Sequence, residues 1–212
     1  MLKKLTEEKL TEVLGAGISE FAEHGFHHAS MSAIAGRAGI SVGALYKYYA
    51  DKEAFFLACL KKCMKDLDRV LMEVVEPRDH LLVYAERLIE ALQKHAREQR
   101  DCIRLYNRLA AGGIPGVERL VEEIEGLTAK LYTGFMETAK RDGTARPDMD
   151  AGLFAFFFDN LLMMMQFSYT CDYYRERFRL YCGEDVLGQD AYVREELLKF
   201  FRSAFTVSTV NG

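Results

Sequence analysis

In the stretch MSAIAGRAGISVGALYKYYADKEAFF, residues 31–56, two short apolar patterns follow one another, separated by a glycine and a serine. The stretch overlaps a longer window, residues 24–50, that contains no Asp or Glu. The chain as a whole is rich in acid, with 32 Asp plus Glu among 212 residues and a net charge of −4. An acidic chain with one carboxylate-free window is expected to meet a negatively charged partner there.

Helix-capping residues divide the N-terminal part into short helices. Thr6 is placed to cap a first helix, and Gly25 is placed to end it with a positive φ. Ser30 precedes a second helix, MSAIAGRA, and Ser41 precedes a third, VGALYKYY. Asp51 is placed to cap a long fourth helix.

The second and third helices have the spacing of a helix-turn-helix. Ala35 is small where two helices would cross, and Gly39, four residues later, can supply a positive φ in the turn. Ile34, Ile40 and Leu45 would fill the small core beneath them. A generic corner between two helices is the alternative, because short helix pairs are common in all-α proteins.

The acid-free window predicts a DNA-binding surface, because a phosphate array repels carboxylates. The window is mildly basic, and the N-termini of its helices would add backbone N–H donors for phosphates. The start of the third helix offers small side chains that can touch thymine methyl groups but make no bidentate hydrogen bonds. The residues predicted to contact DNA are Ser30, Arg37, Ser41, Val42, Gly43, Ala44, Tyr46, Lys47 and Lys52.

Three motifs follow one another in the same region. They are Phe-Ala-x-x-Gly at residues 21–25, Ile-Ala-x-x-Ala-Gly-Ile-Ser at 34–41 and Gly-x-Leu-Tyr-x-Tyr-Tyr at 43–49. In this order they resemble the DNA-binding domain of the TetR family of bacterial transcriptional regulators. Tyr49 stands where the family usually has Phe, and many members carry Arg or a similar polar residue at the position of Ser32.

The resemblance implies an all-α fold with two domains. Residues 1–51 would form a three-helix helix-turn-helix DNA-binding domain, and residues 52–212 a helical ligand-binding and dimerisation domain. The implied function is a DNA-binding transcriptional regulator, a ligand-released repressor that binds a palindromic operator as a homodimer. An activator of the same fold is one alternative, and a small-molecule-binding protein with a decayed DNA-binding part is another.

Composition agrees with a helical, non-enzymatic chain. Half of the residues are hydrophobic and only three are proline, which favours helices. The sequence contains none of the common hydrolase, zincin, P-loop or dinucleotide-binding motifs, so no catalytic residue and no cofactor is predicted.

The five cysteines are scattered and include no C-x-x-C pair. This predicts reduced thiols and a cytoplasmic protein. Cys59 and Cys63 lie four residues apart on a predicted helix, a spacing that can ligate a metal ion. No nearby histidine or second cysteine pair completes a site, so both are expected to be structural.

Periodicity and turn signals predict six helices after Asp51. One of them would be capped by Asp148 and run for roughly thirty residues. The other expected ranges are 52–76, 79–97, 101–111, 116–141 and 190–206.

Residues 151–171 are apolar over about the length of a membrane span. Asp159, Asn160 and Gln166 interrupt the segment, and a charge at the centre of a bilayer costs ~3 kcal/mol. We therefore expect this helix to be buried inside the protein or between two subunits, with no membrane partner.

Apolar and aromatic residues on the long helices exceed what a scaffold requires, which favours a pocket for an apolar or amphipathic effector. Ordinary core is the alternative for each of them. The predicted ligand-binding residues are Tyr106, Leu131, Phe135, Phe158 and Met165.

The last helix has one apolar face at helical spacing, and the apolar helix before it needs cover on several sides. Both features predict a dimer interface; burial inside a single chain is the alternative. The predicted interface residues are Phe157, Met164, Leu197 and Phe201.

Overall fold

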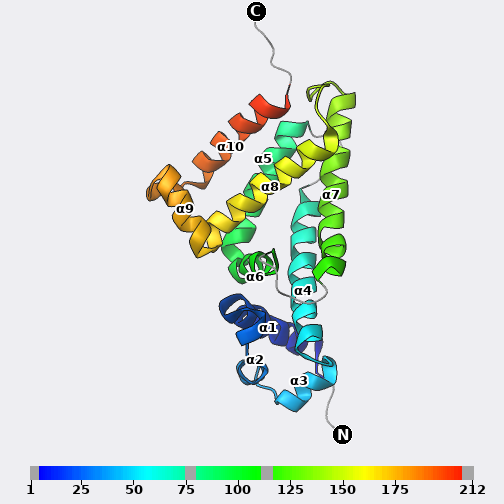
Figure 1. Ribbon diagram of the computed structural model, residues 1–212, viewed down its shortest axis with the longest axis vertical. Helices are drawn as coiled ribbons and strands as arrows, with labels where there is room; N and C mark the ends of the chain where they lie inside the picture. The colour runs from blue at the N-terminus through cyan, green and yellow to red at the C-terminus, as the bar shows by residue number, and fades with distance from the viewer. Residues whose placement is uncertain (1–4, 75–79, 111–116, 207–212) are drawn as a thin grey trace, which may run out of the picture. The chain divides into compact units, whose positions relative to one another are not determined.

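The computed structural model describes residues 5–74, 80–110 and 117–206, and every regular element in these ranges is helical (Figure 1). The predicted all-α fold class is confirmed. The elements are α1 (Glu7–His28), α2 (Met31–Arg37), α3 (Val42–Tyr48), α4 (Lys52–Glu73), α5 (Leu81–Glu98), α6 (Arg100–Ala110), α7 (Val117–Arg141), α8 (Ala151–Thr170), α9 (Asp172–Cys182), the 3-10 helix η1 (Asp185–Gly188) and α10 (Asp190–Phe205).

The chain divides into two compact units. α1, α2, α3, most of α4 and α6 belong to the first unit, and α5 and α7 to α10 belong to the second. The polypeptide therefore crosses between the units three times: within α4, between α5 and α6, and between α6 and α7. The first unit comprises Met1–Leu67 and Gln99–Pro115, and the second comprises Asp68–Glu98 and Gly116–Gly212. The functional division after residue 51 stays a prediction.

The four predicted N-caps of the N-terminal region are confirmed. In each, a side-chain oxygen accepts a hydrogen bond from the backbone N–H three residues later, at 2.7 to 3.2 Å. Each bond satisfies a donor that the first helical turn leaves unpaired, which stabilises the helix by ~1 kcal/mol. The caps are Thr6, Ser30, Ser41 and Asp51.

Two glycines make the predicted turns. Gly25 has a φ of 73° and interrupts α1 three residues before its end at His28. Gly39 has a φ of 63°, and the turn is closed by a hydrogen bond of 2.9 Å from the N–H of Ile40 to the carbonyl of Ala35. A side chain with a Cβ would be strained at either position.

An aromatic cluster holds α1 against α4 in the first unit. Phe21 meets Phe56 edge to face at a centroid distance of 5.0 Å, and Phe26 meets Phe56 at 5.3 Å. The helices approach closely at Gly17, where a Cβ would lie 2.5 Å from the ring of Phe55. Small size at this position lets the rings fill the space between the helices.

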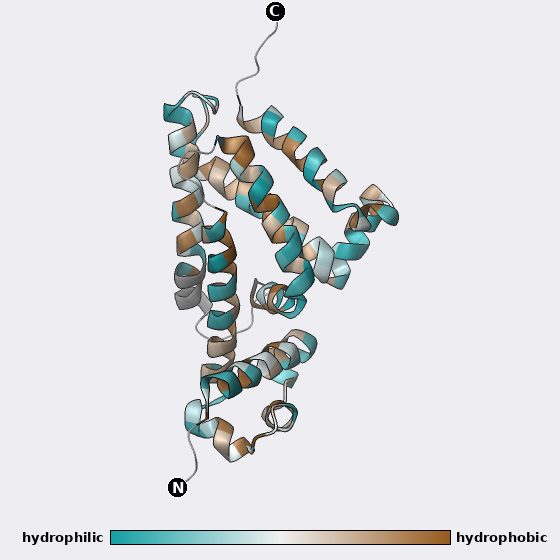
Figure 2. Ribbon diagram, turned by 180° about the vertical axis from the view of Figure 1, so that it is seen from behind, coloured by the Kyte–Doolittle hydropathy of each residue, from teal (hydrophilic) through white to brown (hydrophobic). Residues whose placement is uncertain are grey.

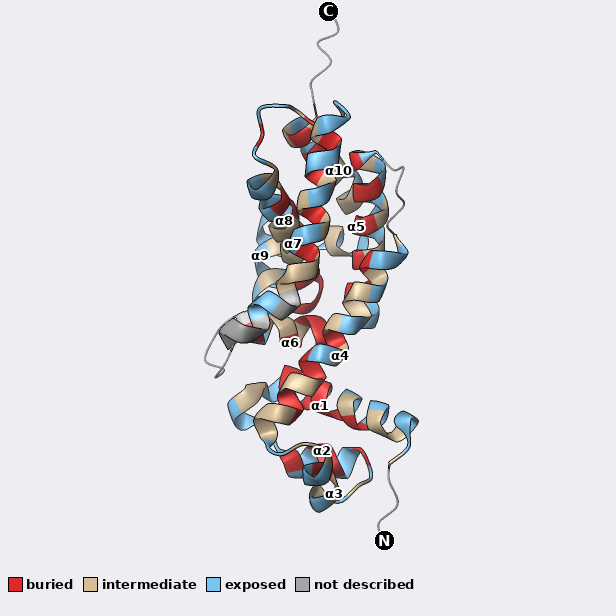
Figure 3. Ribbon diagram, turned by 90° about the vertical axis from the view of Figure 1, so that its right-hand side faces the viewer, coloured by how far each residue is buried: buried red, intermediate tan, exposed pale blue. Residues whose placement is uncertain are grey.

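In the second unit, α8 packs against α5, α7 and α9, and α10 packs against α5. Polar and apolar residues alternate along α5, α7 and α10, so each of these buries one face, whereas α8 is mostly apolar and no residue of α9 is buried (Figures 2 and 3). Phe158 meets Tyr132 at a centroid distance of 5.3 Å and Phe201 at 4.7 Å. Phe201 also meets Phe205 at 5.3 Å. These rings form the centre of the second core.

The prediction of a single long helix capped by Asp148 was wrong. Asp150 is the cap, accepting a hydrogen bond of 2.8 Å from the N–H of Leu153, whereas Asp148 pairs with Arg146 at 2.7 Å. α8 then ends after 20 residues, because Cys171 has an extended backbone and α9 begins directly after it. Neither Gly nor Pro marks this break, so local pattern gave no sign of it.

The remaining helix predictions agree with the structure to within a few residues. α10 begins at the predicted residue and ends one residue earlier than expected, and α4 ends at Glu73. Asp79, the expected start of α5, lies outside the described residues.

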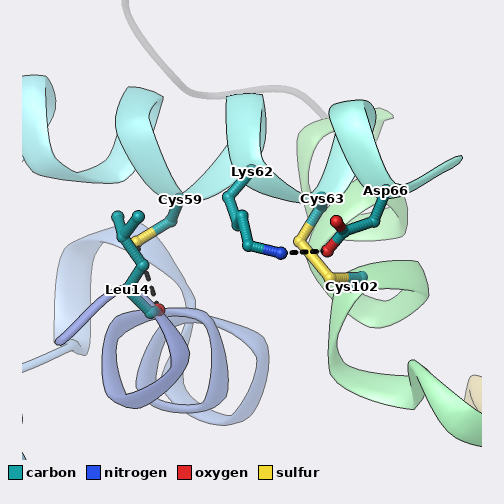
Figure 4. Close-up of a disulfide and its surroundings, with 6 residues drawn as sticks. All are labelled: Leu14, Cys59, Lys62, Cys63, Asp66 and Cys102. Atoms are coloured by element: carbon teal, nitrogen blue, oxygen red, sulfur yellow. Dashed lines mark hydrogen bonds and ion pairs between the residues drawn. A yellow bond between two sulfur atoms is a disulfide. The ribbon is translucent and has the colours of Figure 1, made fainter. Parts of the chain in front are cut away.

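The prediction that all five cysteines are reduced was wrong for one pair. Cys63 of α4 and Cys102 of α6 form a disulfide with a Cα–Cα distance of 5.3 Å (Figure 4). Their separation of 39 residues gives no sequence signal, because only the packing of α6 brings them together. Cys59 and Cys171 are buried and Cys182 is exposed, and none of the three takes part in a disulfide. Among the residues that the structure describes, no group of three or more His, Cys, Asp or Glu side chains is placed to hold a metal ion.

Candidate nucleic-acid interface

The helix-turn-helix is built by α2 and α3, which pack against one another. Ile34 and Leu45 of the predicted small core are almost completely buried together with Ala35, whereas the third predicted member, Ile40, is half-buried. The opposite side of the two helices is exposed. It carries no carboxylate, and Gly36, Gly43 and the other small residues project little side-chain volume from it.

The carboxylate nearest the motif is turned inward. Glu20 of α1 is only 3% exposed, and its Oε1 accepts a hydrogen bond of 2.9 Å from the N–H of Ser30. Its Oε2 lies 3.4 Å from Nη2 of Arg37. Glu20 thus ties α1 to both ends of α2 while presenting no charge on the outer face. Sequence analysis missed this residue, although an acid within the apolar run that ends at Phe21 was a usable signal.

The residues predicted to contact DNA differ in their exposure and in their partners inside the protein. Tyr46 and Lys47 are exposed on α3, and no hydrogen bond or ion pair engages them among the described residues. Arg37 is held by Glu20, yet its side chain remains 46% exposed. Ser30 and Ser41 are exposed, and their hydroxyl oxygens act as the N-caps of the two helices.

Lys52 has partners inside the protein. Its Nζ donates a hydrogen bond of 3.0 Å to the carbonyl of His27 and lies 5.3 Å from the ring centroid of Phe26. These contacts fasten the start of α4 to the end of α1. A DNA phosphate that bound Lys52 would have to compete with these contacts for the same ammonium group.

The N-terminal end of α3 presents the predicted small residues. Val42 and Ala44 are half-buried and Gly43 is exposed. A Cβ added at Gly43 would meet no atom within 4 Å, so the space in front of it is open. The geometry permits close approach of a flat partner such as a base-pair edge.

Another contact of the motif was not foreseen. The hydroxyl of Tyr48 accepts a hydrogen bond of 2.6 Å from the N–H of Leu5. Tyr48 therefore fixes the residue before α1 to the end of α3. Its neighbour Tyr49 packs on Phe55 at 4.7 Å and belongs to the core side.

The predicted ligand-binding residues are split between the two units. Tyr106 lies on α6 in the first unit, and the other four lie on α7 and α8 in the second. Phe135 stacks on Tyr84 of α5 with centroids 4.0 Å apart. Phe158 and Met165 are buried, and Leu131 is half-buried.

The second core also contains polar groups that lack partners. The hydroxyl of Tyr84 and the Oε1 atoms of Gln93 and Gln166 are buried and make no hydrogen bond within the described part of the chain. Burial, together with the nearby charge of Glu125, raises the pKa of Asp159 on α8 to about 6. Sequence analysis treated Asp159 and Gln166 only as interruptions of an apolar segment.

The predicted interface residues differ in exposure. Phe157 is 51% exposed on α8, Met164 and Leu197 are half-buried, and Phe201 is 1% exposed. Phe201 is thus core of its own chain, the alternative left open for α10. Other apolar side chains stand exposed nearby in the sequence, namely Leu153 and Phe156 on α8 and Tyr192 and Phe200 on α10.

α8 is long and apolar enough to cross a membrane by length and composition, but a third of its apolar stretch is buried inside the chain. Next to α9 it borders a groove of about 540 Å³, which is lined by Leu161, Met164, Ser168, Tyr173, Tyr174, Arg177, Phe178 and Tyr181. None of the predicted ligand-binding residues lines this groove.

Comparisons with known proteins agree with the motif. A family model described as "Bacterial regulatory proteins, tetR family" matches residues 13–59. The HTH-type transcriptional regulator UidR of Escherichia coli K12 is 30% identical over 147 residues, which is 68% of this chain and 72% of UidR. The HTH-type transcriptional repressor KstR2 of Rhodococcus jostii is 26% identical over 145 residues, 68% of this chain and 71% of KstR2.

Solved structures share the whole fold. A TetR family transcriptional regulator from Chloroflexus aurantiacus superimposes with a TM-score of 0.74 over 96% of both chains, at 18% identity. This similarity extends through the second unit, which the matched family model does not cover. The chain therefore belongs to the TetR family of bacterial regulatory proteins, which are DNA-binding transcriptional regulators and not enzymes.

Proposed function

We propose that this regulator is a cytoplasmic repressor that binds a palindromic operator as a homodimer and leaves it when a small amphipathic molecule binds the second unit. The observation that carries the proposal is the exposed, carboxylate-free outer face of α2 and α3, beside which Glu20 is turned inward. Such a face suits a phosphate array.

Affinity is expected to come chiefly from the DNA backbone. Tyr46 and Lys47 stand exposed at one side of α3, and Ser41 stands at its start. Val42, Gly43 and Ala44 would touch base edges by shape and by contact with thymine methyl groups. One such motif is small, so a twofold pair reading two half-sites about one helical turn apart would bind far more tightly.

Exposed aromatic side chains support the homodimer. Phe156 and Phe157 on α8 are 61% and 51% exposed, and Phe200 on α10 is 54% exposed. Several large apolar side chains on the same helices are more than isolated surface residues. A second copy of the chain is the proposed cover, with Met164 and Leu197 contributing from the same two helices.

The polar groups of the second core support an amphipathic effector. Phe158 and Met165 are buried and Phe135 is half-buried, whereas Tyr84 and Gln166 offer buried atoms without partners among the described residues. Buried polar atoms are normally satisfied, and a bound molecule with one hydrogen-bonding group would satisfy them.

The alternatives are weaker. A decayed DNA-binding part would be expected to lose caps and gain surface acids, but the caps Ser30 and Ser41 are formed and the outer face has no acid. An activator would use the same DNA contacts. The repressor is preferred because the relative KstR2 carries that name.

The DNA-binding proposal is tested by selecting duplexes from a random-sequence pool with the purified protein. We expect enrichment of a palindrome with half-sites about one helical turn apart. Gly43→Asp should abolish the enrichment, since it places a carboxylate in open space on the outer face without a steric clash. Gly43→Ala is the matched control and should still bind. A pool without any enriched sequence would reject the proposal.

The regulatory direction is tested with the selected palindrome placed over a reporter promoter. Expression of the protein should lower reporter output, and Gly43→Asp should restore it. Higher output with the wild-type protein would instead identify an activator.

A further inference from the structure

The disulfide between Cys63 and Cys102 joins two helices that are far apart in the sequence. Cys63 is on α4 and Cys102 is on α6, and both belong to the first unit (Figure 4). Their side chains are 5% and 6% exposed, so the bond lies at the edge of the core. The ion pair between Lys62 and Asp66 lies beside it on α4.

Each of these helices is connected to the DNA-reading motif. α4 follows α3 directly, and its start is fastened to the end of α1 by Lys52. α6 packs along α1, and Nη2 of Arg108 donates a hydrogen bond of 3.3 Å to the carbonyl of Glu23. The disulfide therefore links two helices covalently: α4, which follows the helix-turn-helix in the chain, and α6, which packs along α1.

The bond also closes a ring of chain. The segment from Cys63 to Cys102 leaves the first unit within α4, forms α5 in the second unit and returns as α6. Two of the three chain crossings between the units thus fall inside this ring. When Cys63 and Cys102 are reduced, no covalent bond closes this ring.

A protein that binds DNA in the cytoplasm works under reducing conditions, where disulfides are transient and usually have a redox or sensing role. The other cysteines are unsuited to replace this pair. Cys59 is completely buried, its thiol faces the carbonyl of Leu14 at 3.8 Å, and burial raises its pKa. Cys171 and Cys182 belong to the second unit and form no disulfide.

We propose that Cys63 and Cys102 are a reversible oxidation site whose substrate is a hydroperoxide, and that their oxidation strengthens operator binding. The second half of this inference rests on the proposed function. The disulfide removes conformations in which α6 parts from α4, so the oxidised first unit is held in one arrangement. A binding surface held in one arrangement loses less conformational entropy when it meets DNA.

The chemistry balances with hydrogen peroxide as the oxidant. The first thiol gives up its proton and its sulfur attacks a peroxide oxygen; the O–O bond breaks, a sulfenic acid forms, and the displaced hydroxide takes up that proton and leaves as the first water. The second thiol likewise gives up its proton and attacks the sulfenic sulfur; the S–O bond breaks, the S–S bond forms, and the displaced hydroxide takes up the second proton and leaves as the second water. The two sulfurs together lose the two electrons that the peroxide gains. Two equivalents of a small thiol reverse the reaction by exchange.

The oxidation site is tested on the full chain carrying Cys182→Ser, which removes the exposed thiol. Reduced protein is treated with stoichiometric hydrogen peroxide, digested under alkylating conditions and analysed by mass spectrometry. We expect one disulfide-linked peptide pair, containing Cys63 and Cys102, which dithiothreitol removes. Persistent free thiols at both positions would overturn the proposal, as would linkage to Cys59 instead.

The coupling is tested with the same protein in both redox forms and a palindromic duplex selected from random DNA by an equal mixture of the two. We expect the oxidised form to bind at least about fivefold more tightly. Cys63→Ser and Cys102→Ser should each bind like the reduced form with and without peroxide. If either variant does not fold, the comparison of the oxidised and reduced forms of the Cys182→Ser protein still tests the coupling.

The possible outcomes separate this inference from the proposed function. Equal affinity of the two forms, or tighter binding by the reduced form, overturns the coupling but leaves the repressor proposal intact. Absence of sequence-specific binding by both forms rejects the repressor and the coupling together. The mass-spectrometric experiment tests the oxidation site independently of both DNA-binding outcomes.

Discussion

The carboxylate of Glu20 accepts a hydrogen bond from the N–H of Ser30 at 2.9 Å, so a buried acid of α1 fixes the residue that caps α2. The same carboxylate lies 3.4 Å from the guanidinium of Arg37, at the other end of α2. The orientation of the first helix of the motif therefore depends on one side chain that DNA would never touch.

Glu20→Ala should destabilise the protein by about 2 kcal/mol, because it leaves the part-buried N–H of Ser30 and the Arg37 side chain without their acceptor. Glu20→Gln keeps one acceptor oxygen for Ser30 and should cost less. Urea unfolding followed by circular dichroism measures both. An alanine variant as stable as wild type would show that water replaces the carboxylate.

Lys47→Ala should weaken binding to specific and random DNA alike and lower the slope of log K against log salt by about 0.9, the value for one phosphate contact. The ammonium of Lys47 is exposed and makes no hydrogen bond or ion pair among the described residues. Lys130→Ala, at an exposed position on α7 in the second unit, is the control and should leave the slope unchanged. Equal slopes for wild type and Lys47→Ala would remove this residue from the phosphate contacts.

Two glycines of α1 should respond in opposite directions to alanine. In Gly17→Ala the new Cβ would lie 2.5 Å from the Phe55 ring and 2.7 Å from the Cys59 sulfur, and overpacking of this kind costs about 1–3 kcal/mol. Gly15→Ala meets nothing within 4 Å and should stabilise the exposed helix by about 0.5–1 kcal/mol. Thermal unfolding of both variants checks this. Similar shifts for both would mean that α1 and α4 readjust freely.

The features that could be predicted from the sequence are those that depend on neighbours along the chain. Ser30, Ser41 and Gly39 act through bonds and backbone angles within a few residues, and each does what its position indicated. The same stretch of sequence also predicted an outer face that has small side chains and no acidic residue.

The features that could not be predicted arise from contacts between distant segments. The bond from Cys63 to Cys102 requires α6 to lie on α4, and the inward turn of Glu20 requires α2 to lie on α1. Phe201 shows the same limit: its place on an apolar helix face did not reveal whether its own chain or a partner would bury it.

Asp159 should make stability depend on pH between about 4 and 6. Its pKa in the folded chain is raised to about 6 from 3.8, so over this range the folded state binds more protons than the unfolded state. Stability is then greatest below the lower value, falls as pH rises through the window, and stays level above it. Asp159→Asn should remove this fall and stabilise the protein at pH 7 by roughly 1–3 kcal/mol.

Denaturant unfolding of wild type and Asp159→Asn at several pH values gives the difference directly. The remaining carboxylates contribute equally to both proteins and cancel. A difference that does not change between pH 4 and 7 would show that Asp159 is hydrated in the folded chain.

The last prediction concerns the two sides of α10. Phe200 is 54% exposed and Phe201 is 1% exposed, although they are adjacent, because successive residues of a helix point in different directions. Phe157 of α8 is exposed in the same way. If a second copy of the chain covers α8 and α10, charges at the exposed positions should separate the subunits without unfolding them.

Phe157→Glu combined with Phe200→Glu should give a folded monomer that no longer binds palindromic DNA tightly. Phe201→Glu is the contrasting variant and should unfold the second unit, since it buries a carboxylate against Phe158 at a ring contact of 4.7 Å. Light scattering gives the mass of each variant and circular dichroism its helix content. A folded double variant that remains a dimer would place the interface elsewhere, and a folded Phe201→Glu would contradict its assignment to the core.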